Sequence, residues 1–154
     1  MIQRKQTIYL LIAALLTGVL FFMPFARFAG AEGSFLLTVK GIWIQMGPGE
    51  KSLEVSTYPL MILVSLSTLV SLMAVGLYKK RLLQIRLCGI NLALQAGLSG
   101  FIFYYGQTTA KILSAAVSYE WVVVFPLIAL VLTILAFIAI GKDEALVRSV
   151  NRIR

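Results

Sequence analysis

The 154-residue chain contains no histidine, one cysteine and only six acidic residues. Without histidine, histidine-ligated haem and most zinc sites are excluded, and the commonest general base is missing. The single cysteine, Cys88, excludes a disulfide within one chain and dithiol redox chemistry. Asp143 and Glu144 are adjacent, so on a helix they point about 100° apart and do not form a catalytic carboxylate pair.

Sequence motifs for nucleotide binding and hydrolysis are absent as well. The chain has no P-loop, no glycine-rich dinucleotide motif and no Gly-x-Ser-x-Gly elbow. We therefore expect no enzyme, no cofactor and no metal site.

Charged side chains are also missing from four long apolar stretches, which run Thr7 to Ala26, Val55 to Tyr78, Leu87 to Ala110 and Trp121 to Gly141. Each has about 20 residues or more, enough for a helix rising about 1.5 Å per residue to cross a hydrocarbon core of about 30 Å. We predict an all-α membrane protein, with residues 1–154 forming one antiparallel bundle of four transmembrane helices. No carboxylate lies within a span, although proton-coupled pumps commonly place one there.

Basic residues are distributed unevenly between the two sides that these spans define. The segments before the first span, between the second and third, and after the fourth hold ten of the 14 basic residues and two of the six acidic ones. These basic residues are Arg4, Lys5, Lys79, Lys80, Arg81, Arg86, Lys142, Arg148, Arg152 and Arg154. The positive-inside rule predicts that this side is cytoplasmic and that both termini lie there. Topology explains the net charge of +8, so we expect no nucleic-acid partner.

The first span admits a second interpretation as a signal peptide. Arg4 and Lys5 precede the apolar run, and Ala29-Gly30-Ala31 follows it as a small-residue cleavage site. The run is longer than the usual 7–15 residues or so, and Arg27 intervenes before the small residues. We therefore predict a retained helix.

Residues 27–54 form the main segment outside the bilayer. Phe35 to Gln45 is rich in strand-forming residues, Met46 to Gly49 reads as a turn, and Leu53 to Ser56 could return as a strand. We predict a small hairpin-like extracytoplasmic loop. The other outer connection, Lys111 to Glu120, carries no motif.

The third span combines small and polar residues. Gly89, Ala93 and Gly97 recur every four residues, which predicts a face that another helix can approach closely. Asn91 and Gln95 belong to a neighbouring polar stripe. We predict that both stripes serve helix packing, and that the chain could also form homo-oligomers through this span. A polar pathway for a solute is the alternative.

The inner segments are candidates for contact with lipid or protein. Four cations in the second inner segment suit anionic headgroups, and the tail 142–154 has helical spacing that could dock on a cytoplasmic protein. The candidate contact residues are Lys79, Lys80, Arg81, Arg86, Arg148 and Arg152.

Three motifs resemble one bacterial family. They are Met1-Ile2-Gln3-Arg4, Leu83-Gln84-Ile85-Arg86-Leu87-Cys88, and the closing Lys142-Asp143-Glu144-Ala145-Leu146-Val147-Arg148-Ser149. The family is catalogued as domain of unknown function 4293, a set of small four-span proteins of the bacterial cytoplasmic membrane. The resemblance implies fold, topology and a bacterial inner membrane, and it implies no catalytic residue, ligand or cofactor.

Two functions are consistent with these features. The first is a non-enzymatic accessory or scaffold subunit that binds another protein through its inner basic segments and tail. The alternative is a small transporter or channel for a neutral or amphipathic solute, which would use Asn91 and Gln95.

Overall fold

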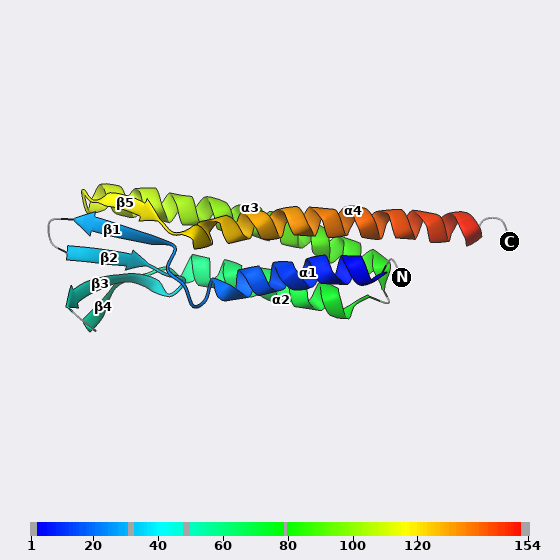
Figure 1. The fold of residues 1–154 in the computed structure, drawn as a ribbon, viewed down its shortest axis with the longest axis horizontal. Coiled ribbons are helices and arrows are strands. Elements are labelled where there is room, and N and C mark those ends of the chain that lie inside the picture. The colour runs from blue at the N-terminus through cyan, green and yellow to red at the C-terminus, as the bar shows by residue number, and fades with distance from the viewer. Residues whose placement is uncertain (1–2, 31–32, 48–49, 79, 152–154) are drawn as a thin grey trace.

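The computed structural model describes residues 3–30, 33–47, 50–78 and 80–151. Four helices lie side by side, and a small antiparallel sheet is placed at one end of them (Figure 1). The helices are α1 (Gln3–Val19), α2 (Tyr58–Gly76), α3 (Arg81–Ile112) and α4 (Phe125–Asn151), with a short 3₁₀ helix η1 (Trp121–Val124) before α4. The strands are β1 (Ala26–Gly30), β2 (Gly33–Leu37), β3 (Gly41–Gly47), β4 (Glu50–Ser56) and β5 (Ala116–Tyr119).

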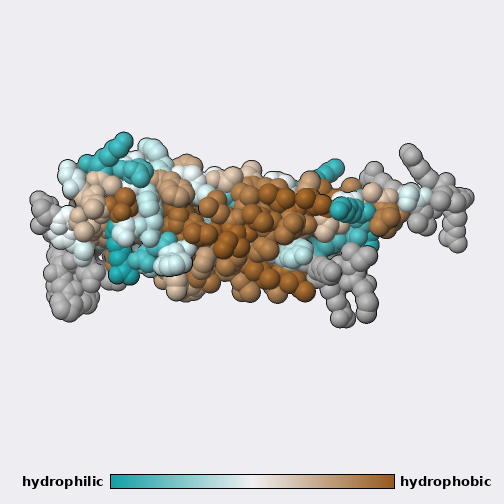
Figure 2. All heavy atoms as spheres, turned by 45° about the horizontal axis from the view of Figure 1, so that its top comes forward, coloured by the Kyte–Doolittle hydropathy of each residue, from teal (hydrophilic) through white to brown (hydrophobic). Residues whose placement is uncertain are grey.

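Three helical segments among the described residues are long and apolar enough to cross a membrane. They are Tyr58–Gly76, Arg81–Ile112 and Trp121–Val147, while α1 contributes a shorter apolar helix over Gln6–Val19. Figure 2 shows hydrophobic residues covering the middle of the helices on the face in view, with hydrophilic residues gathered towards both ends. The prediction of a multi-pass membrane protein agrees with these features.

The first helix is shorter than the apolar run predicted for it. The run extends to Ala26, but α1 ends at Val19 and Ala26 already belongs to β1. The amides of Leu20 and Phe21 donate to carbonyls three residues earlier, which tightens the end of the helix. Pro24 follows and cannot continue a helical hydrogen-bond ladder because it has no N–H.

Each helix contacts two neighbours. Both α1 and α3 lie against α2 and α4. One buried cluster takes residues from all four helices near the end opposite the sheet: Leu10, Ala74, Cys88, Ala136 and Ile140. A larger cluster joins the sheet to the helices, with Phe25, Phe28, Leu37, Leu60 and Leu98 among its fully buried members. The second cluster fixes the sheet on the helix ends.

The outer segment contains more structure than one hairpin. The sheet has the order β4-β3-β2-β1-β5, with every pair antiparallel. Strand β4 agrees with the predicted return strand. Of the predicted turn, Met46 and Gly47 belong to β3, and Pro48 and Gly49 lie outside the described residues. The stretch Phe35 to Gln45, rich in strand-forming residues, contributes to two strands, because the chain bends at residues 39–40 between β2 and β3. The amide and the hydroxyl of Thr38 both donate to the carbonyl of Gly41, each at 2.9 Å.

Strands β1 and β5 were not predicted. They pair with each other although about 90 residues separate them, with Arg27 opposite Ser118 in the register. The amide of Glu120 donates to the carbonyl of Phe25 at 2.9 Å, and Arg27 Nε lies 2.6 Å from Glu120 Oε1. The segment between α3 and α4 is thus part of the sheet.

Candidate functional site

A buried polar contact between α2 and α3 is built around Asn91. Its side-chain amide donates to Ser71 Oγ at 2.8 Å, and its carbonyl oxygen accepts from Ser67 Oγ at 2.9 Å. Ser67 and Ser71 are four residues apart and therefore share one face of α2. All three side chains are buried. Both ends of the carboxamide are therefore hydrogen-bonded across the interface between α2 and α3.

Further hydrogen bonds are made by polar side chains between and within the helices. Thr68 Oγ1 donates to Thr17 Oγ1 at 3.2 Å and links α2 to α1. Gln84 Nε2 donates to the carbonyl of Ala74 at 3.0 Å and holds the start of α3 on the end of α2. Thr133 Oγ1 turns back to the carbonyl of Ala129 within α4 at 2.8 Å. The buried polar groups thus mostly bind protein atoms.

Gln95 is the exception among the described residues. Its side chain is fully buried, and neither Nε2 nor Oε1 has a hydrogen-bond partner. It lies one helical turn beyond Asn91, on the side towards the sheet. A buried amide without a partner costs about 1–3 kcal/mol. No contact described within the chain therefore explains why a glutamine lies at this buried position.

The small-residue stripe of α3 faces away from the other helices. Gly89 and Ala93 are exposed and Gly97 is half-buried, and a Cβ added at Gly89 or Gly97 would meet nothing within 4 Å. Close packing inside the chain is therefore not the reason for these small residues. Homo-oligomerisation through this face stays a prediction. Beside it lies an apolar hollow of about 530 Å³, lined by Gly97, Gly100, Phe101 and Tyr104.

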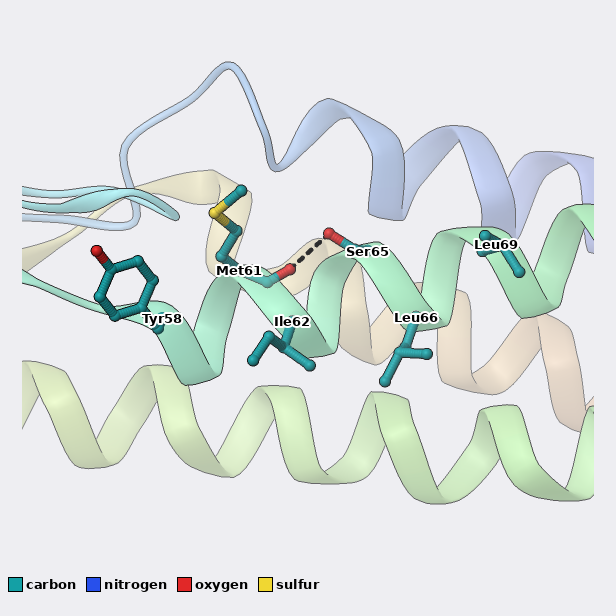
Figure 3. Close-up of a pocket in the computed structure, with 6 residues that line it drawn as sticks. All are labelled: Tyr58, Met61, Ile62, Ser65, Leu66 and Leu69. Carbon is teal, nitrogen blue, oxygen red and sulfur yellow. Dashed lines mark hydrogen bonds between the residues drawn. The ribbon is translucent and has the colours of Figure 1, made fainter.

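A second hollow, of about 360 Å³, lies on the outer face of α2 (Figure 3). Its lining is Tyr58, Met61, Ile62, Ser65, Leu66 and Leu69. The only hydroxyl in the middle of this lining, that of Ser65, donates to the carbonyl of Met61 at 2.7 Å. Apart from the hydroxyl of Tyr58, the surface left for a ligand is apolar, which suits a lipid acyl chain.

The helix ends opposite the sheet carry the predicted cationic contact residues. Lys80 and Arg86 are exposed, while Arg81 is half-buried. Arg81 Nη1 donates to the backbone carbonyl of Asp143 at 3.3 Å, and the Asp143 carboxylate accepts from Gln6 Nε2 at 2.7 Å. Asp143 thus joins the ends of α1, α3 and α4, a role that the sequence did not predict because nothing in the spacing relates residues 6 and 143.

The structure describes the other three predicted contact residues only in part. Lys79 and Arg152 lie outside the described residues. Arg148 lies on α4, and only its backbone position is described. In the part of the chain that the structure describes, no group of three or more His, Cys, Asp or Glu side chains could hold a metal ion.

Comparison with known families decides the relationship of this chain. The model of a family described as Domain of unknown function (DUF4293) matches residues 2–153. The protein belongs to the DUF4293 family. The resemblance predicted from the three sequence motifs is therefore confirmed. None of the curated proteins matches the chain. Because the family description assigns no activity, the chemistry of this DUF4293 protein has to be argued from its geometry.

Proposed function

We propose that this protein is a non-enzymatic accessory or scaffold subunit of a complex in a bacterial inner membrane. It crosses that membrane four times, with both termini in the cytoplasm and the sheet on the opposite side. The feature that carries the proposal is the end of α4, which continues beyond α1 and beyond the connection between α2 and α3 (Figure 1).

Helix length supports four crossings. The 19 residues of α2 span about 28 Å, close to a hydrocarbon core of about 30 Å, and the apolar part of α1, Gln6–Val19, spans about 21 Å. Phe22 and Met23, just after α1, are 89% and 47% exposed and extend its apolar surface towards the sheet. At the same level, Tyr58 and Trp121 are 68% and 87% exposed, as residues of an interfacial aromatic belt would be.

Charge supports the orientation. Lys80 and Arg81 lie at the start of α3, and Lys142 lies on the part of α4 beyond its apolar run, all away from the sheet. Arg4 and Lys5 on α1, Arg86 on α3 and Arg148 on α4 belong to the same end. On the sheet side, Arg27 pairs with Glu120, so one of the few cations there is balanced by an acid. The positive-inside rule then assigns the basic end to the cytoplasm.

The protruding end of α4 has the properties of a docking helix. Beyond Gly141, where the apolar run ends, Leu146 is 62% and Val147 is 42% exposed. Lys142 and Arg148 lie on the same stretch of helix. A basic helix with exposed aliphatic side chains suits an acidic partner with an apolar groove, in the helix-in-groove mode of recognition. The proposed partner is therefore a cytoplasmic or membrane protein with an acidic surface.

The test compares two substitutions of equal charge. Leu146→Asp places a carboxylate at the exposed aliphatic position, and Ala145→Asp does so at an exposed neighbour about 100° around the helix. After purification in mild detergent, the partner recovered with the unmodified protein should be lost with Leu146→Asp and kept with Ala145→Asp. Recovery of no reproducible partner across several detergents would contradict the proposal.

A second function, transport of a small neutral solute, is favoured by one observation. Gln95 has a buried amide without a partner, and such a group would suit a solute-binding site. The hydrogen bonds of Asn91 to Ser67 and Ser71 weigh against it, since they leave no unpaired amide there for a solute. In a Cys88→Ser background, cysteines at positions 91 and 95 should resist aqueous thiol reagents; rapid labelling of both would favour transport.

A further inference from the structure

A third hollow lies at the basic end, between the first turn of α3 and the segment of α4 beyond its apolar run. Its volume is about 440 Å³, and it is lined by Lys80, Arg81, Leu82, Leu83, Glu144 and Val147. The lining thus combines two cations, one acid and three aliphatic side chains. On the proposed topology this hollow lies at the cytoplasmic edge of the membrane.

The positive charge of the hollow is only partly balanced. Arg81 is held in place by the hydrogen bond from Nη1 to the carbonyl of Asp143. The Asp143 carboxylate accepts from Gln6 Nε2, and among the described residues no ion pair joins it to Arg81. Among the described lining residues, Glu144 is the one acid, against Lys80 and Arg81. These cations also stand at the N-terminus of the 32-residue helix α3, where the helix dipole favours a negative group.

The aliphatic part of the lining distinguishes a lipid from a free anion. Leu82 is 51% exposed, and Leu83 and Val147 are each 42% exposed. A soluble phosphate would use the two cations and leave these side chains uncovered. A phospholipid would use both parts, with its phosphate at the cations and the upper part of an acyl chain along the leucines.

We infer that this hollow binds one molecule of an anionic phospholipid, with its phosphate between Lys80 and Arg81. The site holds the lipid against α3 and α4 at the end where α4 leaves the membrane. The inference rests on the proposed topology and shares Val147 with the partner proposal, but its cations Lys80 and Arg81 are distinct from Leu146. The variants at Lys80 and Arg81 therefore test the lipid site separately from Leu146→Asp.

The experiment measures lipid binding to the purified protein in detergent by native mass spectrometry. The probes are phosphatidylglycerol, phosphatidylethanolamine and phosphatidylcholine with identical acyl chains, and inorganic phosphate. The variant is Lys80→Gln with Arg81→Gln, and the matched control is Arg86→Gln with Lys142→Gln. The control removes the same charge from exposed positions that do not line the hollow.

The unmodified protein should retain one phosphatidylglycerol more tightly than either zwitterionic lipid. At about 1 kcal/mol for each cation near a phosphate-bearing surface, losing both should weaken this binding by at least about tenfold. The control should stay within about twofold. Exchanging the cations, by Lys80→Arg with Arg81→Lys, should restore binding, which separates lost charge from misfolding.

Several outcomes would overturn the inference. Equal loss in the control would mean that diffuse surface charge attracts the lipid. Equal binding of phosphatidylethanolamine would show that the site does not select an anionic headgroup. Competition by inorganic phosphate at the concentration of the lipid would show a site for free anions. A Leu83→Ser variant that binds phosphatidylglycerol as tightly as the unmodified protein would remove the role of the acyl chain.

Discussion

Replacing Ser67 and Ser71 by alanine should destabilise the helices through Asn91. Each substitution removes one hydroxyl and leaves almost no cavity, but together they leave the Asn91 carboxamide without partners at a position that is 1% exposed. Hydrogen bonds between membrane helices contribute about 0.6 kcal/mol on average and up to about 1.7 kcal/mol. Two such bonds give an expected loss of about 1–3 kcal/mol in the free energy of unfolding.

The assay is reversible unfolding in mixed micelles with increasing sodium dodecyl sulfate. Ser65→Ala is the control, because Ser65 lies on the exposed face of α2 and its hydroxyl bonds only to its own helix. It should change stability by no more than about 0.5 kcal/mol. A double-mutant cycle with Asn91→Ala should show coupling, so that the triple variant loses less than the sum of its parts. Strict additivity, or a serine double variant as stable as Ser65→Ala, would refute the reasoning.

Three further predictions concern single residues. Gln95→Met should raise the free energy of unfolding by about 1–3 kcal/mol in the same assay, because it removes a buried amide without a partner; a loss of stability would mean that the amide binds something. Glu120→Gln should cost at most about 1 kcal/mol and the difference should shrink in high salt, because Arg27 is 64% exposed. Gly97→Leu should not destabilise the monomer, since a Cβ there meets nothing within 4 Å and leucine favours a helix more than glycine does. It should reduce any cross-linked dimer in membranes, and an unchanged dimer would exclude this face as its interface.

The sequence predicts the helices well because charge alone marks where they can lie. The apolar stretches without charged residues overlap α2, α3 and α4. The helices α3 and α4 are longer than these stretches, because α3 begins at Arg81 rather than Leu87 and α4 continues to Asn151 beyond Gly141. The end of α1 is not predictable from charge, because the run stays apolar to Ala26. Only Pro24 indicates that the helix has ended. Hydropathy indicates which residues can lie in lipid, but it does not indicate where a helix ends. The end of α1 at Val19 depends on local backbone hydrogen bonds.

The sheet was predicted only where its pairing is local. The β3–β4 hairpin has a turn motif between two nearby strands, so the sequence predicts this pairing. The β1–β5 pairing joins residues 26–29 to 116–119, and strands of four or five residues carry too short an alternation to identify. In β5, the only sequence pattern typical of a strand is the alternation Val117-Ser118-Tyr119. Three residues are too few to predict a strand.

The candidate site also has a part that the sequence predicts and a part that it does not. Polar residues of α3 turn inward because lipid offers them no hydrogen bonds, so the stripe with Asn91 was predictable and its partners on α2 were plausible. Periodicity also separates Gly89 and Gly97 from that stripe, but it does not say which face meets another helix, since small apolar residues tolerate lipid and protein equally. The Gln6–Asp143 hydrogen bond depends on how α1 and α4 align, which only the fold determines.

The most direct test is the side of the membrane on which each end lies, because the partner and lipid proposals both require a cytoplasmic basic end. In a Cys88→Ser background, single cysteines replace Ser34 on β2 and Ser149 on α4, which are both exposed. A membrane-impermeant maleimide added to intact spheroplasts should label position 34 at once and position 149 only after permeabilisation. Labelling of position 149 in intact spheroplasts, with position 34 protected, would contradict the account.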